Sequence, residues 1–357
     1  MAPAASWPAV QRAAEEIVAS GQVPGVVAAL ARDDGAVAHI VVGTDGAGTP
    51  LAADTLSPVA SLTKLATALA VLRLVDSGAL DVADPLARHL PDAAAAREGV
   101  RVRHLFTHTA GLPFNHPEKL APMTAALTWA DIARATLRTA PTRPPGEVSE
   151  YSNVGYNLLG IIVERVTGQP FPEALDTLVL RPLAIEGYMG VAPPRVVAHI
   201  DGVPGPHGGT DLDPYNSPFG LALVRPNGGL VTTAVGGLAL VRAFLGHPAD
   251  FLRPATRAAA TRDQTGGVAG IGAFPQPRAP HGLGPVLRYD GPPYHAVPPT
   301  AGPAAFGHGG SSGCRAWADP ATGVAVAVVN FRFGGLLPWV QEAIAAFGEA
   351  VLADSRT

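Results

Sequence analysis

The chain has 357 residues, of which 47% are hydrophobic and 15% charged, a composition typical of one large globular domain or two ordinary ones. Its formal net charge is −4 and its Lys and Arg residues form no cluster, so the sequence lacks the electrostatic attraction that nucleic-acid binding requires. The single cysteine, Cys314, excludes an intramolecular disulfide, and we expect this side chain to be buried.

No membrane span is expected, because no run reaches the roughly 18 apolar residues of a transmembrane helix. Residues 1–21 lack the basic start and the continuous apolar stretch of a signal peptide. We therefore expect a cytoplasmic protein, unless a signal has been removed from the sequence. The oligomeric state is not indicated.

The N-terminal third predicts a helix, a hairpin and a second helix. Residues 6–21 have an amphipathic pattern that Ser6 can cap and Gly21 can end. Apolar runs at 26–31 and 36–42 flank a compact turn signal and predict two paired strands. Residues 61–77 are apolar nearly all round, which predicts a buried helix.

The rest of the chain alternates helical patterns with loops rich in Gly and Pro. The densest of these loops, 200–228 and 265–303, are predicted to lie on the surface and to form walls of a site. Near the end, two strand patterns flank a turn at 319–323. The predicted helices are 129–137, 153–167, 172–180, 237–245 and 337–352, and the predicted strands are 314–318 and 324–331.

Strands at both ends around a helical middle predict an α+β fold with one antiparallel sheet built from both termini. On this interpretation, residues 1–78 and 226–357 form the sheet domain. Residues 79–225 form a mainly helical insertion domain.

Ser61 and Lys64 form a Ser-x-x-Lys pair at the start of the predicted buried helix. At positions i and i+3 the two side chains share one helix face, so the amine can reach the hydroxyl. The positive end of the helix dipole disfavours a protonated lysine there. The pair therefore predicts an activated serine nucleophile.

A second nucleophile motif, Gly-x-Ser-x-Gly, occurs at 309–313 with Ser311 at its centre. That motif requires a strand before it, a helix after it, and an acid and then a histidine later in the chain. Here a strand pattern follows, and the last histidine, His308, lies upstream. We therefore prefer Ser61.

Tyr151 and Asn153 form a Tyr-x-Asn pair about 90 residues after Ser61, at the start of a predicted helix. A phenol beside a lysine can share its proton, which would relay the Ser61 proton to a leaving group. Taken alone, Tyr151 would be read as a core tyrosine.

The third element is His308, Gly309 and Gly310, followed by Ser311. Glycines there let a substrate lie against a strand edge, whose backbone N–H can complete an oxyanion hole with that of Ser61. By contrast, His104 and His108 have helical metal-ligand spacing without an acidic third ligand, so we expect no metal site.

With these motifs the sequence resembles the serine β-lactamase and penicillin-binding protein superfamily, in particular the branch of class C β-lactamases, family VIII esterases and D-aminopeptidases. The matching stretches, in family order, include PVASLTKLATALAVLRL, VRHLFTHTAGLP, PPGEVSEYSNVGYNLLG, NGGLVTTA and FGHGGSSGCRAWADP. They lie between about 55 and 332, and the N-terminal helix and hairpin also fit.

The resemblance implies Ser61 as the acylated nucleophile, Lys64 as the base and Tyr151 as the proton shuttle. It places Asn153 on the acyl side of the substrate and the N–H groups of Ser61 and Ser311 in the oxyanion hole. It also implies a site between a sheet domain and a helical domain, with no metal or cofactor.

The substrate prediction rests on two departures from the family. One is the missing export signal, because neither peptidoglycan nor a periplasmic antibiotic would be met in the cytoplasm, and the other is in the third motif. Where β-lactamases usually carry Lys-Thr-Gly, this chain has His308, Gly309 and Gly310, so the permanent cation and the hydroxyl that would hold a substrate carboxylate are both missing. We therefore expect an esterase on small, uncharged acyl esters.

Other functions stay open at this point. Within enzymes they are β-lactamase or D-aminopeptidase activity on an amide, and acyl transfer to an alcohol or amine instead of water. From another class, the chain could be a catalytically idle module that binds a small ligand.

Overall fold

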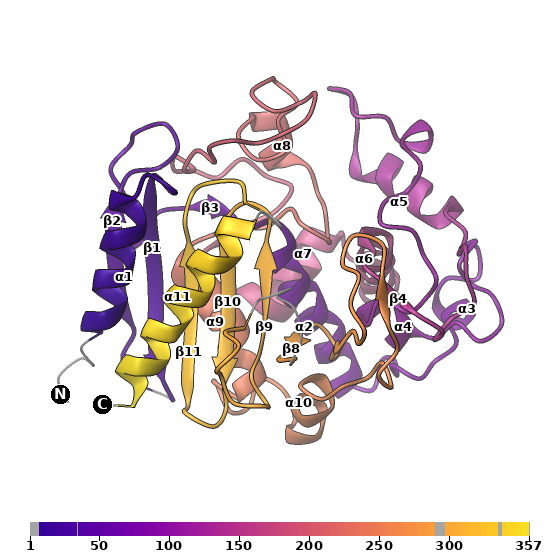
Figure 1. Ribbon diagram of the computed structural model, residues 1–357. Helices are drawn as coiled ribbons and strands as arrows, with labels where there is room; N and C mark the ends of the chain where they lie inside the picture. Colours follow the sequence, from indigo (N-terminus) through magenta and orange to yellow (C-terminus); the bar gives the residue numbers. More distant parts are fainter. Residues whose placement is uncertain (1–6, 34, 290–296, 335–337, 357) are drawn as a thin grey trace.

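Figure 1 shows a computed structural model that describes residues 7–33, 35–289, 297–334 and 338–356. Its main sheet has six strands in the order β2-β1-β11-β10-β9-β8, and every neighbouring pair is antiparallel. Strands from the two ends of the chain thus lie side by side, which confirms the predicted α+β fold. The strands are β1 (Gly25–Arg32), β2 (Ala38–Gly43), β8 (Val286–Leu287), β9 (Phe306–Gly310), β10 (Cys314–Asp319) and β11 (Val324–Val329).

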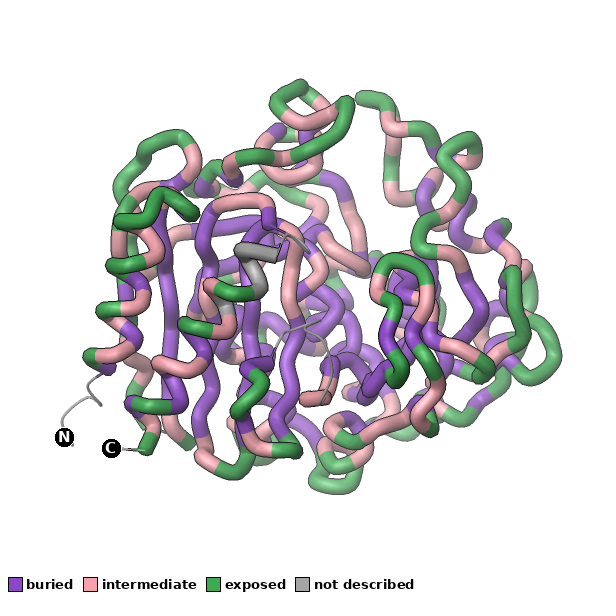
Figure 2. The backbone as a smooth tube through the Cα atoms, viewed as in Figure 1, coloured by how far each residue is buried: buried purple, intermediate pink, exposed green. Residues whose placement is uncertain are grey.

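The central strands are apolar on both faces because helices cover the sheet from both sides. Val26, Ala28 and Leu30 of β1 join a core with α1 (Pro8–Ala19) and α11 (Pro338–Ser355). The alternate residues of β1 face the other core, which contains α2 (Thr63–Asp76) and α9 (Ala234–Leu245). Figure 2 shows the central strands buried along most of their length.

In Figure 1, α3, α4, α5 and α6 of the middle segment gather beyond β9, whereas α8 lies at the top of the view, above the sheet. The helices predicted at 129–137 and 153–167 are confirmed, and the one predicted at 172–180 is α7 continued as a π-helix, Asp176–Leu180. None of the described helices is long and apolar enough to cross a membrane. The helices of this segment are α3 (Leu86–His89), α4 (Val102–Phe106), α5 (Trp129–Arg138), α6 (Asn153–Thr167), α7 (Phe171–Leu175) and α8 (Pro218–Ala222).

Several predicted boundaries move for identifiable reasons. The predicted cap Ser6 and the predicted start at Leu337 lie outside the described residues. The helix predicted from Gly237 begins at Ala234, because the Thr233 side chain caps it by accepting the Gly236 N–H at 3.1 Å. The sequence pattern does not predict α3, α4, α8 or α10 (Pro254–Ala260). Helices this short have little periodicity.

The predicted long loops contain only short elements. Besides α8, they carry β7 (Gly270–Ile271) and β8, and residues 290–296 lie outside the described part. β7 pairs in parallel with β4 (Ser149–Glu150), which directly precedes Tyr151. β3 (Ser57–Pro58) lies directly before the Ser61 turn and joins β6 (Val231–Thr232) and β5 (Gly187–Tyr188) in a small sheet that supports this turn.

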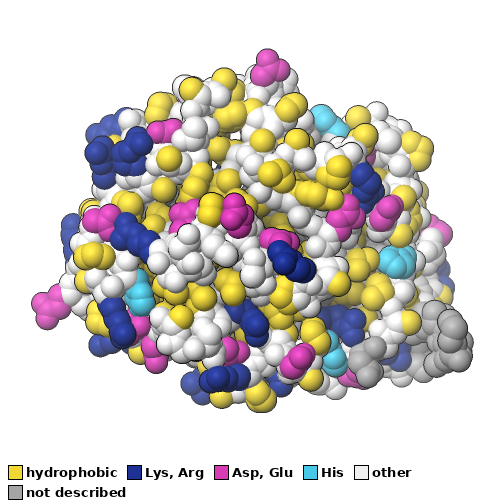
Figure 3. Space-filling model, turned by 180° about the vertical axis from the view of Figure 1, so that it is seen from behind, with side chains coloured by type: hydrophobic (Ala, Val, Ile, Leu, Met, Phe, Trp, Pro, Cys, Tyr) yellow, Lys and Arg dark blue, Asp and Glu magenta, His cyan; other side chains and the backbone are white. Residues whose placement is uncertain are grey.

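The division into 1–78 plus 226–357 and 79–225 stays a prediction. The larger core runs across that division, since Val27, Leu69, Tyr156 and Leu238 belong to one buried cluster. On the face shown in Figure 3, basic and acidic side chains are interspersed, with no field of one sign.

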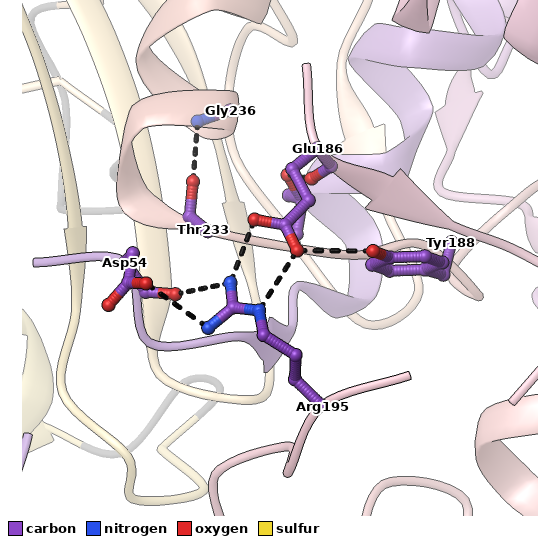
Figure 4. A network of polar contacts seen from close by, with 7 residues as sticks. Asp54, Glu186, Tyr188, Arg195, Thr233 and Gly236 are labelled. Carbon is purple, nitrogen blue, oxygen red and sulfur yellow. Dashed lines mark hydrogen bonds and ion pairs between the residues drawn. The ribbon is translucent and has the colours of Figure 1, made fainter. Parts of the chain in front are cut away.

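A polar network ties two surface loops to β5 (Figure 4). Arg195 binds both carboxylate oxygens of Glu186 through Nε at 3.1 Å and Nη2 at 2.7 Å. The same guanidinium reaches the Asp54 side chain at 3.2 Å, and the Tyr188 hydroxyl donates to Glu186 at 3.1 Å. These side chains are largely exposed, so each pair contributes little to stability.

Candidate active site

Ser61 lies in a short 3₁₀ turn, Ala60–Leu62, directly before α2. Ala60 has φ +43°, a left-handed conformation that is uncommon for a residue with a side chain. The neighbouring backbone holds it there: the Val59 N–H donates to the Leu230 carbonyl at 3.0 Å, and the Leu62 N–H donates to the Val59 carbonyl at 3.0 Å. The nucleophile candidate therefore stands on a sharply bent, fixed turn.

The Lys64 amine lies beside the Ser61 hydroxyl. Its Nζ is 3.1 Å from Ser61 Oγ, 2.8 Å from Asn153 Oδ1 and 2.8 Å from the Asn227 carbonyl oxygen. All three partners are uncharged, and none of the described acidic residues forms an ion pair with Lys64. Because the side chain is fully buried, its pKa is lowered well below the usual 10.5. An amine in this state can accept the Ser61 proton.

The first turn of α2 also fixes the segment 226–230. The Thr63 hydroxyl accepts the Leu230 N–H at 3.0 Å, and the Thr67 hydroxyl donates to the Pro226 carbonyl at 2.6 Å. These bonds hold the Asn227 carbonyl against Lys64. Thr63, Lys64 and Thr67 follow helical spacing, so one face of α2 makes all these contacts.

Tyr151 packs over Lys64 in an aromatic cluster. Its ring stacks on His108 at 4.3 Å between centroids and meets the edge of Phe274 at 4.9 Å. Lys64 Nζ lies 4.9 Å from the Tyr151 ring centroid. The structure thus brings Ser61, Lys64 and Tyr151 together, while their catalytic roles stay predictions.

Asn153 links Lys64 to the loop that follows α4. Its Oδ1 accepts from Lys64, and its Nδ2 donates to Asn115 Oδ1 at 2.8 Å. Its own N–H donates to the Phe114 carbonyl at 2.7 Å. Ser152 caps α6 by accepting the Gly155 N–H at 3.2 Å, which sets where Asn153 begins the helix.

β9 approaches the Ser61 turn so closely that Gly310 has no room for a side chain. A Cβ there would lie 2.4 Å from the Val59 carbonyl oxygen and 2.6 Å from Cys314 Sγ. Cys314, buried as expected, donates its thiol to the same Val59 carbonyl at 3.0 Å. The turn after β9 carries Ser311, whose Oγ lies 2.8 Å from the Tyr215 hydroxyl.

His308 lies on β9 behind the pocket wall. The pocket is lined by Gly309, Gly310 and Ser311 but not by His308, which is 1% exposed. Its Nδ1–H donates to the Gly309 carbonyl at 2.7 Å, and burial lowers its pKa to about 3. The imidazole is therefore neutral at physiological pH. A contact with substrate stays a prediction.

Two more buried histidines complete the surroundings of Tyr151. His108 accepts the Ser152 N–H at Nδ1 (3.0 Å), and the His281 ring lies 5.0 Å from it. Burial lowers the pKa of both, that of His281 to about 4. His104, the other half of the rejected metal pair, accepts the Arg101 N–H instead. The described residues contain no cluster suited to a metal ion.

A pocket of about 710 Å³ opens over Ser61, Tyr151 and Asn153. Sequence reasoning missed several of its lining residues, because they lie on loops or on a helix and a strand whose patterns are typical of the core. The sequence predicted that the site has no permanent cation, but Arg315 supplies one to the pocket wall. Its guanidinium lies against Gly309, 3.4 Å from where a Cβ would be. The only feature of the sequence that could have indicated Arg315 is its place as a basic residue in an apolar strand. The missed lining residues include Asn115, Asn157, Tyr215, Arg225 and Arg315.

Comparison with known proteins agrees with this geometry. A family model described as Beta-lactamase matches residues 10–345. Esterase EstB of Burkholderia gladioli is 37% identical over 179 residues, which is 45% of this chain and 45% of that protein. The matched region therefore spans less than half the length of that relative.

Two solved structures show the same fold over nearly the whole chain. A penicillin-binding protein homologue from Caulobacter crescentus has a TM-score of 0.76 and 26% identity, covering 98% of this chain and 97% of that one. EstCE1, described as a hydrolase with promiscuous acyltransferase activity, has a TM-score of 0.73 and 21% identity, covering 96% and 97%.

Proposed function

This chain belongs to the beta-lactamase family, and from that premise we propose that it is a serine hydrolase that cleaves small acyl esters through an acyl-enzyme. The observation that carries the proposal is the 3.1 Å contact between Ser61 Oγ and a buried Lys64 amine with uncharged partners only. The name of the relative EstB supports ester substrates.

Acylation begins with the transfer of the Ser61 proton to the neutral Lys64 amine. The Oγ then forms a bond to the ester carbonyl carbon, and the carbonyl π electrons move onto its oxygen. The N–H groups of Ser61 and Ser311 stabilise this oxyanion. As the tetrahedral intermediate collapses, the C–O bond to the alcohol breaks, and the leaving alkoxide takes a proton from Lys64 by way of the Tyr151 hydroxyl.

Deacylation repeats these steps with water. The Tyr151 and Lys64 pair takes a proton from water, the hydroxide adds to the acyl carbon, and the Ser61 oxygen leaves and is reprotonated. An alcohol or amine in place of water would give acyl transfer from the same intermediate. No metal or cofactor takes part in these steps.

The pocket walls support an ester as substrate. Phe114, Phe274 and Leu223 give them apolar surface beside Ser61, and the neutral His308 supplies no charge to hold a carboxylate. Arg315 favours a second candidate, an amide or lactam with a carboxylate, because its guanidinium can bind such a group. A small-molecule substrate is common to both. The cytoplasmic location expected from the sequence stays a prediction that cell fractionation would test.

Turnover of p-nitrophenyl butyrate and of a chromogenic cephalosporin tests the proposal. The wild type is compared with Ser61→Ala and with Ser311→Ala, and intact mass is recorded after each incubation. We expect the wild type to hydrolyse the butyrate ester faster than it cleaves the cephalosporin. The rate of ester hydrolysis should fall roughly 10³-fold or more in Ser61→Ala. Ser311→Ala should change it only a few-fold, because that variant keeps its backbone N–H.

Other outcomes would redirect the function. Hydrolysis that survives in Ser61→Ala but is lost in Ser311→Ala would overturn the choice of nucleophile. Faster cephalosporin cleavage would favour the lactam candidate. A persistent butyryl adduct without turnover would indicate a transferase that lacks its acceptor, or an idle binding module.

A further inference from the structure

The wall of the pocket beside Ser311 is formed by one surface segment, residues 206–228. The Tyr215 hydroxyl lies 2.8 Å from Ser311 Oγ, so this segment contacts the turn that carries a candidate oxyanion donor. Near the end of the segment, the Thr67 hydroxyl of α2 donates to the Pro226 carbonyl at 2.6 Å. The wall is therefore fixed on both sides. Its lining residues include Pro206, His207, Pro214, Tyr215, Leu223 and Arg225.

Arg225 is a cation of this wall that has no counter-charge. Its Nη2 donates to the Pro214 carbonyl at 2.8 Å and to the Gly220 carbonyl at 3.3 Å, and both partners are uncharged. None of the described acidic residues lies close enough to stabilise the guanidinium, so burial lowers its pKa. An arginine nevertheless stays protonated in proteins.

Part of the Arg225 guanidinium remains available to a ligand. Nε is closed off from solvent and has no partner, so no ligand can reach it. Nη1 also has no hydrogen bond to a described residue, but it is not closed off in the same way. Because Arg225 lines the pocket, Nη1 is the atom that can meet an anion there. A cation withdrawn from bulk water is stabilised by such a partner.

The proposed mechanism indicates which half of the ester faces Arg225. The leaving alcohol has to lie beside the Tyr151 hydroxyl, which protonates it. The described rings that pack on Tyr151 all come from outside the segment 206–228. That segment adjoins Ser311 instead. The acyl half of the substrate, which extends away from the leaving alcohol, is therefore the half that reaches Arg225.

We propose that Arg225 binds a carboxylate at the far end of the acyl group, so that the enzyme prefers monoesters of dicarboxylic acids to esters of uncharged acids. The inference rests on the proposed function, because it takes the side of the leaving group from that mechanism. It narrows the substrate class from small acyl esters to acyl chains with a terminal carboxylate. The pocket of about 710 Å³ has room for such a chain.

Matched ligands isolate the carboxylate. The methyl monoesters of adipic, pimelic and suberic acid are compared with their terminal amides, which have the same size and no charge. All are titrated calorimetrically into the Ser61→Ala protein, so that binding is measured without turnover. For at least one chain length we expect the carboxylate to bind about tenfold or more tightly than the amide, the effect of a charge-assisted hydrogen bond. Equal binding of every pair would overturn the proposal, and this comparison needs no variant of Arg225.

Arg225→Gln in the Ser61→Ala background should abolish the preference, because it removes the charge and keeps a donor for the loop carbonyls. The amide ligands should bind this variant as they bind the parent protein. If Arg225 only held the loop, both ligands of a pair would weaken together and the preference would survive, which would overturn the proposal. Arg315→Gln is the matched comparison, since Arg315 also lines the pocket. A preference lost there but kept in Arg225→Gln would assign the carboxylate to Arg315 instead.

A second pair of ligands tests the acyl side. The butanoate ester of 6-hydroxyhexanoate carries its carboxylate in the alcohol half, and its terminal amide is the neutral partner. We expect these two to bind the Ser61→Ala protein equally. A carboxylate preference in this pair, with none among the dicarboxylic monoesters, would overturn the assignment of Arg225 to the acyl half.

The p-nitrophenyl esters of the same acyl groups then separate this inference from the proposed function. The wild type should hydrolyse the carboxylate ester with a higher kcat/KM than the amide ester, and Arg225→Gln should equalise the two. Turnover of both esters without preference would contradict the role of Arg225 alone. A binding preference without any turnover would support the subsite and contradict the hydrolase.

Discussion

At the scale of single residues, the state of Lys64 decides what the site can do. A buried amine with a carboxylate partner would stay protonated, but here the partners are a hydroxyl, an amide oxygen and a backbone carbonyl. Desolvation without a counter-charge lowers the pKa and makes the lysine a base. The lowered pKa of Lys64 also makes the stability of the protein depend on pH.

Lys64→Met should differ from the wild type by an amount that depends on pH. Between the lowered folded pKa and 10.5, the unfolded wild type binds one proton that the folded protein does not, so its stability rises with pH by about 1.4 kcal/mol per unit. The Met variant lacks this proton. Its stability relative to the wild type should therefore fall as the pH is raised, as urea unfolding at pH 7 and 9.5 can measure.

The other lysine of the chain provides the control. Lys119→Met, a substitution at an exposed position, is measured in the same way. A pH-independent difference between Lys64→Met and the wild type would contradict a neutral Lys64.

At the scale of elements, the contact between β9 and the Ser61 turn positions the two candidate oxyanion donors. The backbones meet directly because Gly310 has no side chain, and the Cys314 thiol bonds the Val59 carbonyl from the next strand. Ser61 and Ser311 thus lie on two elements whose separation depends on one glycine.

Gly310→Ala should displace β9 from the Ser61 turn. Its Cβ would fall 2.4 Å from a backbone oxygen that cannot move freely, so we expect a loss of about 1–3 kcal/mol in the free energy of unfolding and a lower kcat. Gly309→Ala is the matched control: its Cβ would meet Arg315 at 3.4 Å, an ordinary contact. Equal unfolding free energies for the two variants, measured in urea, would refute the steric argument.

At the scale of the whole molecule, the buried histidines make the core sensitive to acid. Burial lowers the pKa of four of them, to about 4 for His104 and His281 and to about 3 for His308, and well below 6.5 for His108. Below pH 6.5 these histidines bind protons in the unfolded chain that they do not bind in the folded chain. Stability is therefore lost as the pH falls from 6.5 towards 4.

His281→Gln should reduce this acid sensitivity. Each buried neutral histidine contributes up to about 1.4 kcal/mol per pH unit to the slope of unfolding free energy in that range, so the variant should lose one such contribution between pH 6 and 4.5. His39→Gln serves as the control, since His39 is exposed. A slope equal to that of the wild type in His281→Gln would show that this imidazole is protonated in the folded protein.

Sequence alone predicted the features that depend on local spacing. A Ser-x-x-Lys at a helix start shares one helix face whatever the fold, and α6 begins and ends where its pattern predicted. The apolar runs at both termini likewise predicted strands, because strands buried on both faces need apolar side chains throughout.

Only the tertiary structure decided which distant groups meet these residues. The Asn227 carbonyl reaches Lys64 across 163 residues of chain, and Tyr215 reaches Ser311 across 96. In the sequence, Arg315 is a basic residue that interrupts a core strand, and Asn157 is one polar position in a buried helix. The structure shows that both residues line the pocket. Such contacts follow from how elements pack against one another, which no local pattern encodes.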